Sequence, residues 1–315
     1  MRIGIIGSGG VGSYFGAKLH RAGHEVVFVA RGEHLHAMQQ NGLHVKHPSL
    51  EFSSHVHALD MQALLQTKPL IYDLFILLTK SMETANIARE LSAWLDAHGA
   101  NTYILSLQNG VENEDILAEY LPKTSIIGGL TRKIGAHVLK AGYVEAVGIA
   151  ETIVGSIVHD SHTQLFVEKL SEAFTAAGIP THVTLDIRKE LWKKLIINNG
   201  VNALCALLEV KTGVLMHHPK LSPLVLGLMQ ETAKAARALH VNISSEDVNA
   251  MFELIAGFES IKPSMLVDLE HHRTLELEEI CGVVRRSLEK EGLDAPYTQT
   301  IVSLLEYKME KNNES

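Results

Sequence analysis

The sequence opens with a short strand and a glycine-rich loop, and this combination restricts the fold more than any other feature. Arg2 to Ile6 read as a buried strand, and GSGGVG follows at residues 7–12. A helical segment comes next, and a second β-branched run, EVVFVAR, ends at Arg31. A strand, a G-x-G-x-x-G loop, a helix and a second strand within about thirty residues form the unit that binds dinucleotides. The sequence therefore predicts a Rossmann-type domain at the start of the chain.

The glycines of this loop have separate expected roles. Gly7 permits a tight turn, Gly9 leaves room for a pyrophosphate, and Gly12 lets the helix lie close to the strand. The N-terminus of the helix offers unpaired N–H groups and partial positive charge to the same group. A glycine-rich turn without a ligand is the weaker alternative, because both flanking strands are present. The residues expected to bind the cofactor are Gly7, Ser8, Gly9, Gly10, Val11 and Gly12.

The end of the second strand indicates which nicotinamide cofactor is bound. Arg31 stands about twenty residues after the glycines, where an acidic residue would bind the ribose 2′-hydroxyl of NAD. A guanidinium can instead form a two-pronged contact with a 2′-phosphate. A solvated loop arginine is the alternative. We predict NADP rather than NAD.

The rest of the first half alternates strands and helices. DLFILLTK and TYILSLQNG are strand-like, with a helical segment between them, and this order predicts a mostly parallel sheet with helices on both faces. Lys80 and Asn109 follow two of these strands and are expected near the cofactor, although Lys80 could only cap a strand and Asn109 could only form a turn. Residues 125–157 predict antiparallel strands that extend the sheet. We place the domains at residues 1–185 and 186–315.

The second half is nearly all helical, and one of its helices carries an unusual polar strip. In ELWKKLIINNGVNAL, residues 190–204, Lys194, Asn198 and Asn202 recur every fourth position and share one face. Amides and Gly200 lower helix propensity, so the helix accepts costs that a plain surface helix could avoid. A solvent-facing strip is the alternative. Lys193 points elsewhere and is expected to be exposed.

Composition excludes several classes of function. A formal charge of −8 argues against nonspecific nucleic-acid binding, and no apolar run is long enough for a membrane helix. Cys205 and Cys281 are too few for a disulfide framework and suit a reducing cytoplasm. The adjacent pairs of histidines lack the spacing of a metal site, so no metal is expected. The helical half could mediate a homodimer.

These motifs together resemble the ketopantoate reductase family, the 2-dehydropantoate 2-reductases. The similarity spans nearly the whole chain and keeps the family's order. It rests on GSGGVG, Thr79-Lys80, LQNG at 107–110, ELWKKLIIN at 190–198, Asn202, SML at 264–266 and Glu276.

The resemblance implies a Rossmann domain followed by a helical substrate and catalytic domain. It implies NADPH-dependent reduction of 2-dehydropantoate to (R)-pantoate, on the route to pantothenate and coenzyme A. By position, Lys194 would donate the proton and Glu276 would orient the reacting groups and contact the cofactor. The residues that would bind the substrate are Asn109, Lys194, Asn198, Asn202 and Ser264.

The chemistry of the lysine agrees with that role. Reduction of a keto carbon leaves negative charge on its oxygen, and an ammonium group can stabilise this charge and supply a proton. Burial would lower the pKa of Lys194 toward neutrality, whereas a nearby Glu276 would oppose the shift. The sequence leaves open which effect is larger.

Some positions depart from the family pattern and keep alternatives open. Thr212 and Leu275 replace residues usual in the family, and Arg132 and Lys133 stand where small or neutral residues are common. A paralogous NADP-dependent reductase for another branched or hydroxylated 2-keto acid is therefore one alternative, and the arginine-lysine pair could indicate a more acidic substrate. A non-catalytic NADP-binding sensor is another, although it would have no reason to keep the lysine strip together with Ser264 and Glu276.

Overall fold

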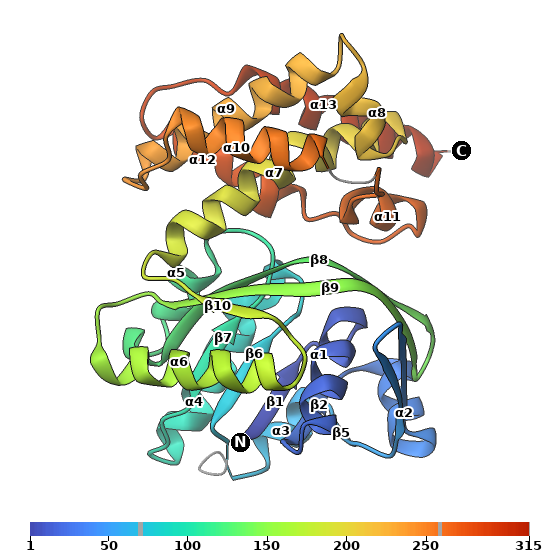
Figure 1. The fold of residues 1–315 in the computed structure, drawn as a ribbon, viewed down its shortest axis with the longest axis vertical. Coiled ribbons are helices and arrows are strands. Elements are labelled where there is room, and N and C mark those ends of the chain that lie inside the picture. Colours follow the sequence, from blue (N-terminus) through green and yellow to red (C-terminus); the bar gives the residue numbers. More distant parts are fainter. Residues whose placement is uncertain (69–71, 258–259, 315) are drawn as a thin grey trace. The chain divides into compact units, whose positions relative to one another are not determined.

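The computed structural model describes residues 1–68, 72–257 and 260–314, with side chains up to residue 311. By its contacts the chain divides into two compact units, Met1–Ile187 and Arg188–Ser315. The first unit holds a sheet covered by helices, and the second is helical in its described residues (Figure 1). The predicted fold class, a Rossmann-type domain followed by a helical domain, is confirmed.

The first unit is built on a ten-stranded sheet, counted over its described residues. Six neighbouring strands run parallel, in the order β5 (His57–Leu59), β2 (Glu25–Val29), β1 (Arg2–Ile6), β6 (Leu74–Leu77), β7 (Tyr103–Ser106) and β8 (Ile126–Lys140). From β1 the chain first builds toward β2 and later returns to β6 on the other side. This reversal is the switch point beyond which open α/β sheets bind their ligands.

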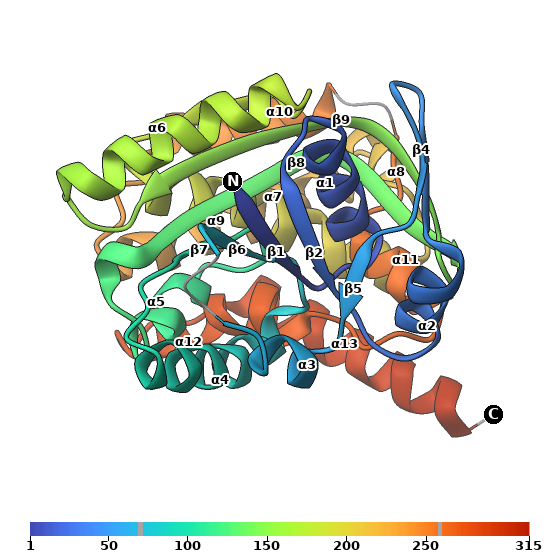
Figure 2. The ribbon, with the colours of Figure 1, turned by 90° about the horizontal axis from the view of Figure 1, so that it is seen from below.

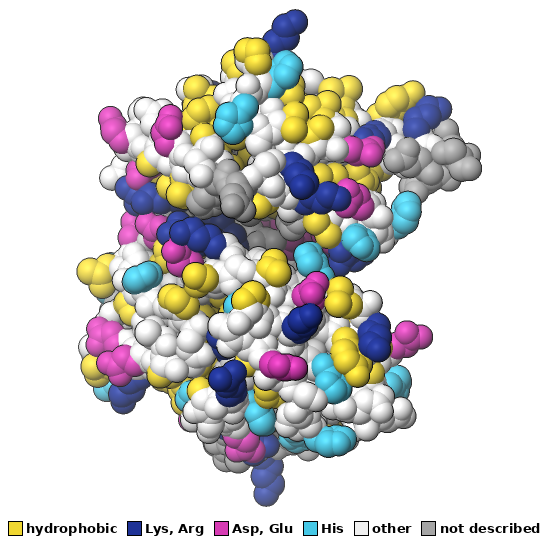
Figure 3. Space-filling model, turned by 45° about the vertical axis from the view of Figure 1, so that its right-hand side comes forward, with side chains coloured by type: hydrophobic (Ala, Val, Ile, Leu, Met, Phe, Trp, Pro, Cys, Tyr) yellow, Lys and Arg dark blue, Asp and Glu magenta, His cyan; other side chains and the backbone are white. Residues whose placement is uncertain are grey.

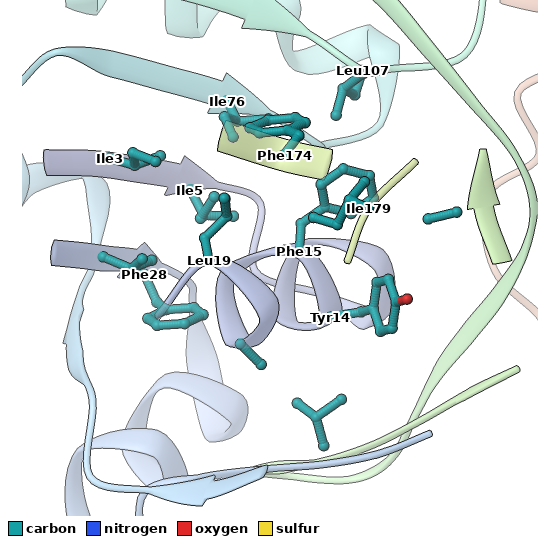
Figure 4. Packing of buried hydrophobic residues seen from close by; sticks show 14 of the residues in the cluster. Ile3, Ile5, Tyr14, Phe15, Leu19, Phe28, Ile76, Leu107, Phe174 and Ile179 are labelled. Carbon is teal, nitrogen blue, oxygen red and sulfur yellow. The ribbon is translucent and has the colours of Figure 1, made fainter. Parts of the chain in front are cut away.

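Alternating side chains bury both faces of this sheet. Ile3 and Ile5 of β1 point into one hydrophobic cluster, and Ile6 points into the other. Helices α1 (Gly10–Arg21) and α6 (Ser161–Ala176) cover the first face, where the rings of Phe15 and Phe174 meet edge to face with their centroids 5.9 Å apart (Figure 4). Helix α4 (Thr84–Ala97) covers the opposite face (Figure 2). The predicted helices on both faces are confirmed.

Two long antiparallel strands extend the sheet, as the sequence predicts. β8 pairs with β9 (Tyr143–Ser156), and the short β10 (Thr181–Val183) joins β9. A β-bulge interrupts the pairing at Lys133, whose φ is +61°. It faces Gly148, with φ +87°, where a β-carbon would lie 2.1 Å from the Lys133 carbonyl oxygen.

The strands between residues 43 and 54 were not predicted from the sequence. β3 (Leu43–His47) forms a hairpin with β4 (Leu50–Ser54), but β3 pairs on its other side with β9, at the far end of the sheet from β2. Helix α2 (Gly32–Asn41) makes the connection from β2. Helix α1 contacts both β2 and β4, so the sheet curls around α1. The remaining short elements are α3 (Met61–Leu65), α5 (Asn113–Ala118) and the 3₁₀ turns Ser81–Glu83 and Lys123–Ser125.

The second unit is arranged around one long helix, α7 (Ile187–Leu208), which begins at the last residue of the first unit. Gly200 lets another helix pack closely, since a β-carbon there would lie 2.9 Å from Met229 Cγ. The other helices are α8 (Thr212–His217), α9 (Ser222–Ala238), α10 (Ser245–Ala256), α11 (Ser264–Glu270), the π-helical turn Glu278–Gly282, α12 (Val283–Glu289) and α13 (Pro296–Glu314).

A buried polar network holds α7 in its place. Asn199 Nδ2 donates to Thr232 Oγ1 of α9 at 2.9 Å and to Thr298 Oγ1 of α13 at 3.1 Å. Glu231 accepts hydrogen bonds from the backbone and the hydroxyl of Thr298, at 2.8 and 2.7 Å. Buried hydrogen-bond networks of this kind fix one relative position of their helices, and here only Asn199 Oδ1, among the atoms named, is buried without a hydrogen-bond partner. The network therefore sets the rotation of α7, and with it the direction of the polar strip.

Candidate active site

The glycine loop has the geometry that a dinucleotide requires. Gly7 has φ +97°, and a β-carbon there would lie 2.6 Å from the Thr79 backbone nitrogen. Gly12 packs the first turn of α1 against the loop, where a β-carbon would lie 2.2 Å from the Gly7 carbonyl oxygen. Gly10 faces the neighbouring hairpin, with the Ala136 carbonyl oxygen at 2.1 Å from the same position. These three glycines are needed for close packing within the protein.

Gly9 differs from the other three. A β-carbon on Gly9 would meet no described atom within 4 Å. Gly9 is also the residue that precedes α1, so the free N–H groups of the first helical turn start beside this open space. Open space beside a helix N-terminus suits a pyrophosphate.

Arg31 lies at the start of α2, next to this loop in the fold. It precedes the first residue of the helix and has an extended backbone, with φ −141° and ψ 162°. Its side chain is 91% exposed, and its Nη1 lies 3.8 Å from a carboxylate oxygen of Glu83. An ion pair this exposed is weak. The guanidinium is therefore available to an incoming phosphate.

Lys80 and Asn109 lie at equivalent places on neighbouring strands. Leu77 of β6 pairs with Ser106 of β7, and each of the two side chains follows three residues later. Both are partly buried. The structure thus brings Lys80 and Asn109 to the same carboxyl edge of the sheet.

Gln108, which the sequence analysis passed over, ties the two loops together. Its Nε2 donates to Thr79 Oγ1 at 3.1 Å and to Thr84 Oγ1 at 2.9 Å. The Asn109 carbonyl accepts from Asn113 Nδ2 at 2.7 Å. The buried amide therefore fixes the backbone on either side of Lys80 and Asn109. Its place in the LQNG segment was visible in the sequence, but its partners were not.

In the second unit, Lys194 lies near a buried carboxylate. Lys194 is partly buried on α7, and Glu276 is 7% exposed. Burial lowers the pKa of Lys194 to about 8, while the charge of Glu276 acts in the opposite direction. Burial is thus the larger of the two effects that the sequence left unresolved. An ammonium with this pKa remains mostly charged near neutrality but gives up its proton readily.

Lys193 provides a direct contrast. We expected it to be exposed, which is wrong: its side chain is 23% exposed and forms ion pairs with Glu190 at 3.0 Å and Asp247 at 3.5 Å. Burial alone would lower the pKa of Lys193, but these two carboxylates together raise it. Neighbouring lysines on one helix therefore have shifts of opposite sign, because their environments differ.

The polar strip continues along α7 from Lys194. Asn198 is partly buried one turn later, and Asn202 is 2% exposed. Asn202 Oδ1 accepts a long hydrogen bond, 3.5 Å, from the Met265 backbone nitrogen. This contact brings the start of α11, and its exposed first residue Ser264, next to the strip. The strip is not a fully solvated helix face.

The unusual cations at Arg132 and Lys133 share one partner. Arg132 Nε and Lys133 Nζ lie 2.8 and 2.9 Å from the two carboxylate oxygens of Glu151. The hydrogen bond from Lys133, more than that from Arg132, holds the pKa of Glu151 below its usual value, although partial burial opposes this shift. The pair is therefore partly neutralised within the hairpin.

Among the described residues, no group of three or more histidine, cysteine, aspartate or glutamate side chains could hold a metal ion. Histidines are scattered over the visible face, and acidic and basic side chains are intermixed (Figure 3). No helix within the described ranges has the length and apolarity needed to cross a membrane.

Comparisons with known proteins agree with this geometry. Residues 3–159 match the family described as ketopantoate reductase PanE/ApbA, and residues 186–309 match its C-terminal part. The 2-dehydropantoate 2-reductase of Archaeoglobus fulgidus is 31% identical over 305 residues, 96% of each chain. That of Pyrococcus abyssi is 30% identical and covers 98% of each chain.

Solved structures show the same fold over the full length. A 2-dehydropantoate 2-reductase from Geobacter metallireducens superposes with a TM-score of 0.85 at 30% identity, covering 98% of this chain and 100% of that one. D-mandelate dehydrogenase with NADH and anilino(oxo)acetate superposes with a TM-score of 0.88 at 25% identity, covering 99% and 100%. Both halves of the chain and the order of its motifs match, and the chain belongs to the ketopantoate reductase PanE/ApbA family.

Proposed function

We propose that this protein reduces 2-dehydropantoate to (R)-pantoate with NADPH, in the synthesis of pantothenate and coenzyme A. The observation that carries the proposal is the full-length likeness to enzymes of that name at about 30% identity. The two units would then be the domains of the enzyme, the first binding NADP and the second binding the substrate and carrying the proton donor. The exposed Tyr297, Leu304 and Tyr307 of α13 offer a surface through which a homodimer could form.

The residues of the first unit suit the cofactor. The space beside Gly9 would receive the pyrophosphate, and Arg31 would bind the 2′-phosphate. Lys80, Asn109 and the remaining loop residues, Ser8, Gly10 and Val11, would complete the site. When bound, the reduced nicotinamide supplies the hydride for the keto carbon.

Lys194 would act on the keto oxygen. Its ammonium group would donate a hydrogen bond to this oxygen and transfer the proton as negative charge develops there. The pKa of about 8 lets it do so near neutral pH. The carboxylate of Glu276 interacts electrostatically with Lys194, and it would hold the ammonium in position and contact the cofactor.

The amides and the hydroxyl would select the substrate. Asn198, Asn202 and Ser264 can hydrogen-bond to a carboxylate and to hydroxyl groups, and Asn109 would reach both substrate and cofactor. Recognition by hydrogen bonds rejects an analogue that lacks the matching group more strongly than an apolar pocket does. We place the reaction in the cytoplasm, because Cys205 and Cys281 are both free thiols.

The test is a steady-state panel of 2-keto acids with NADPH. We expect kcat/KM for 2-dehydropantoate to exceed that for every unhydroxylated analogue. The second candidate is reduction of another 2-keto acid, which the fold likeness to D-mandelate dehydrogenase favours. A higher kcat/KM for the 2-keto acid that is reduced to mandelate than for 2-dehydropantoate would establish the second candidate and reject the first.

Two glycine substitutions test the cofactor loop. Gly9→Ala adds a methyl group only to the open space, where no described atom lies within 4 Å. We therefore expect the melting temperature to change by no more than about 2 °C, while NADPH binding weakens by about tenfold. Gly12→Ala is the matched contrast: its methyl group would collide with the Gly7 carbonyl, so the melting temperature should fall. If stable Gly9→Ala protein binds NADPH with unchanged affinity, the pyrophosphate does not occupy this space.

Arg31 should determine the preference between the two nicotinamide cofactors. Loss of a charge-assisted contact to the 2′-phosphate in Arg31→Ala should weaken NADPH binding by about tenfold. NADH lacks this phosphate, and its dissociation constant serves as the internal control. Fluorescence titration of both cofactors measures the effect. An equal loss for NADH would mean that Arg31 does not read the phosphate.

A further inference from the structure

His34 lies where three segments of the first unit meet. It belongs to the first turn of α2, three residues after Arg31. The Gly142 backbone N–H, in the β8–β9 turn, donates to His34 Nδ1 at 3.1 Å. On the other side of the ring, Nε2 lies 3.5 Å from Ser13 Oγ, in the first part of α1. No motif in the sequence marks this histidine.

The contacts of the ring reach the cofactor loop itself. Ser13 Oγ donates to the Ser8 carbonyl at 3.0 Å, and Ser8 Oγ donates to the Ile5 carbonyl at 3.1 Å. The Ser8 backbone also acts on the His34 ring, since it raises the pKa of His34 against the larger effect of burial. His34 is thus connected through Ser13 to Ser8, the residue that follows Gly7.

The partners determine the state of the ring. Because Gly142 N–H donates to Nδ1, this nitrogen carries no proton, and the remaining proton lies on Nε2, toward Ser8 and Ser13. Burial lowers the pKa of His34, against the opposing effect of the Ser8 carbonyl, so the ring is neutral at physiological pH. A neutral imidazole accepts on one side and donates on the other, as this position requires.

The segment that His34 holds is the one that carries Arg31. Helix α2 starts directly after Arg31, whose carbonyl accepts from the Leu35 N–H at 3.5 Å. The side chain of Arg31 is too exposed to fix its own backbone. The Val29 carbonyl, two residues before Arg31, accepts hydrogen bonds from the Gly7 and Ser8 N–H groups at 3.1 and 2.9 Å, which joins the end of β2 to the loop. His34 adds the contacts that fix the first turn of α2, just after Arg31, relative to the same loop.

We propose that His34 is a positioning residue for the cofactor: it holds the Arg31 segment and the glycine loop in one register, so that a ligand with both a pyrophosphate and a 2′-phosphate meets both sites at once. This inference rests on the proposed use of NADPH. It predicts that His34 contributes to the binding of NADPH more than to that of NADH, although His34 itself contacts neither phosphate. Its contribution must also depend on Arg31.

The test is a double-mutant cycle measured by direct binding. His34→Ala should weaken NADPH binding by about tenfold, for two lost hydrogen bonds, and NADH binding by less than about threefold. In protein that already carries Arg31→Ala, adding His34→Ala should weaken NADPH binding by less than about threefold. Turnover at saturating NADPH should stay near the wild-type value. His36 is exposed two residues further along α2, so His36→Ala is the control and should change the dissociation constant of neither NADPH nor NADH.

The outcomes separate the possible failures. If His34→Ala weakens the binding of NADH and of NADPH equally, its role is merely structural and the inference is overturned. The same holds if His34→Ala weakens NADPH binding equally with and without Arg31. If His34→Ala does not fold, His34→Asn retains an acceptor for the Gly142 N–H, and its NADPH affinity should lie within about threefold of wild type. A tenfold loss in folded His34→Asn would contradict the inference. Wild-type protein that fails to bind NADPH would instead refute the proposed function.

Discussion

Replacing Lys194 by alanine is expected to reduce kcat by about 10²- to 10⁴-fold, the usual contribution of a positioned acid. The variant removes the ammonium that would stabilise and protonate the developing alkoxide. NADPH binding should stay within about threefold of wild type, because the cofactor loop belongs to the first unit. Stopped-flow or steady-state turnover, with NADPH titration alongside, measures both quantities.

Lys193→Ala is the matched control for this prediction. It removes the same type of side chain from the adjacent position of α7, but its ion pairs lead to Glu190 and Asp247. Its kcat should remain within about threefold of wild type, with at most a modest loss of stability for a partly exposed ion pair. Comparable kcat losses in the two variants would mean that Lys194 acts through the stability of the helix and not as the acid.

The pH dependence of kcat/KM should decline on the alkaline side, beginning near pH 8. The protonated ammonium is the active form, and its pKa in the free protein is about 8. Above this value the fraction of active protein, and with it kcat/KM, should fall by about tenfold per pH unit, reaching about a hundredfold at pH 10. An ordinary lysine would keep kcat/KM level to beyond pH 9.

The Glu276→Gln variant tests whether Lys194 is the group whose deprotonation causes the alkaline decline of kcat/KM. The carboxylate of Glu276 raises the pKa of Lys194 against the effect of burial, so its neutralisation should move the decline to lower pH. Glutamine preserves size and hydrogen bonding, and the exposed Glu270→Gln provides the control substitution. A decline that stays in place in Glu276→Gln, or moves to higher pH, would assign it to another group.

The features that local sequence could predict are those that depend on neighbouring residues. The strand, glycine loop and helix at residues 2–21 follow from periodicity and from the conformations that glycine permits, and the helix of Lys194 follows from its apolar spacing. Thr79-Lys80 and LQNG mark strand ends for the same reason. The spacing of Lys194, Asn198 and Asn202 predicted a shared strip, which the helix preserves.

The features that sequence analysis missed depend on contacts between distant segments. His34 acquires its partners from Ser13 and from Gly142, which is 108 residues away. Gln108 is paired with side chains 24 and 29 residues earlier. The exposure of Lys193 was misjudged because Asp247, one of its two ion-pair partners, belongs to another helix; only Glu190 is local. No local pattern encodes such pairs.

The placement of β3 at the far end of the sheet has a consequence for synthesis on the ribosome. The hairpin of β3 and β4 leaves the exit tunnel early, yet its partner β9 is made about a hundred residues later, as the 101-residue separation of the hydrogen-bonded His47 and Gly148 illustrates. Until then α1 lacks part of its cover, and apolar groups and an unpaired strand edge stay open to other nascent chains. Non-local pairing of this kind slows folding. Completion of the first unit must therefore wait until β9 has emerged, which gives chaperones that shield exposed strands a defined interval in which to act.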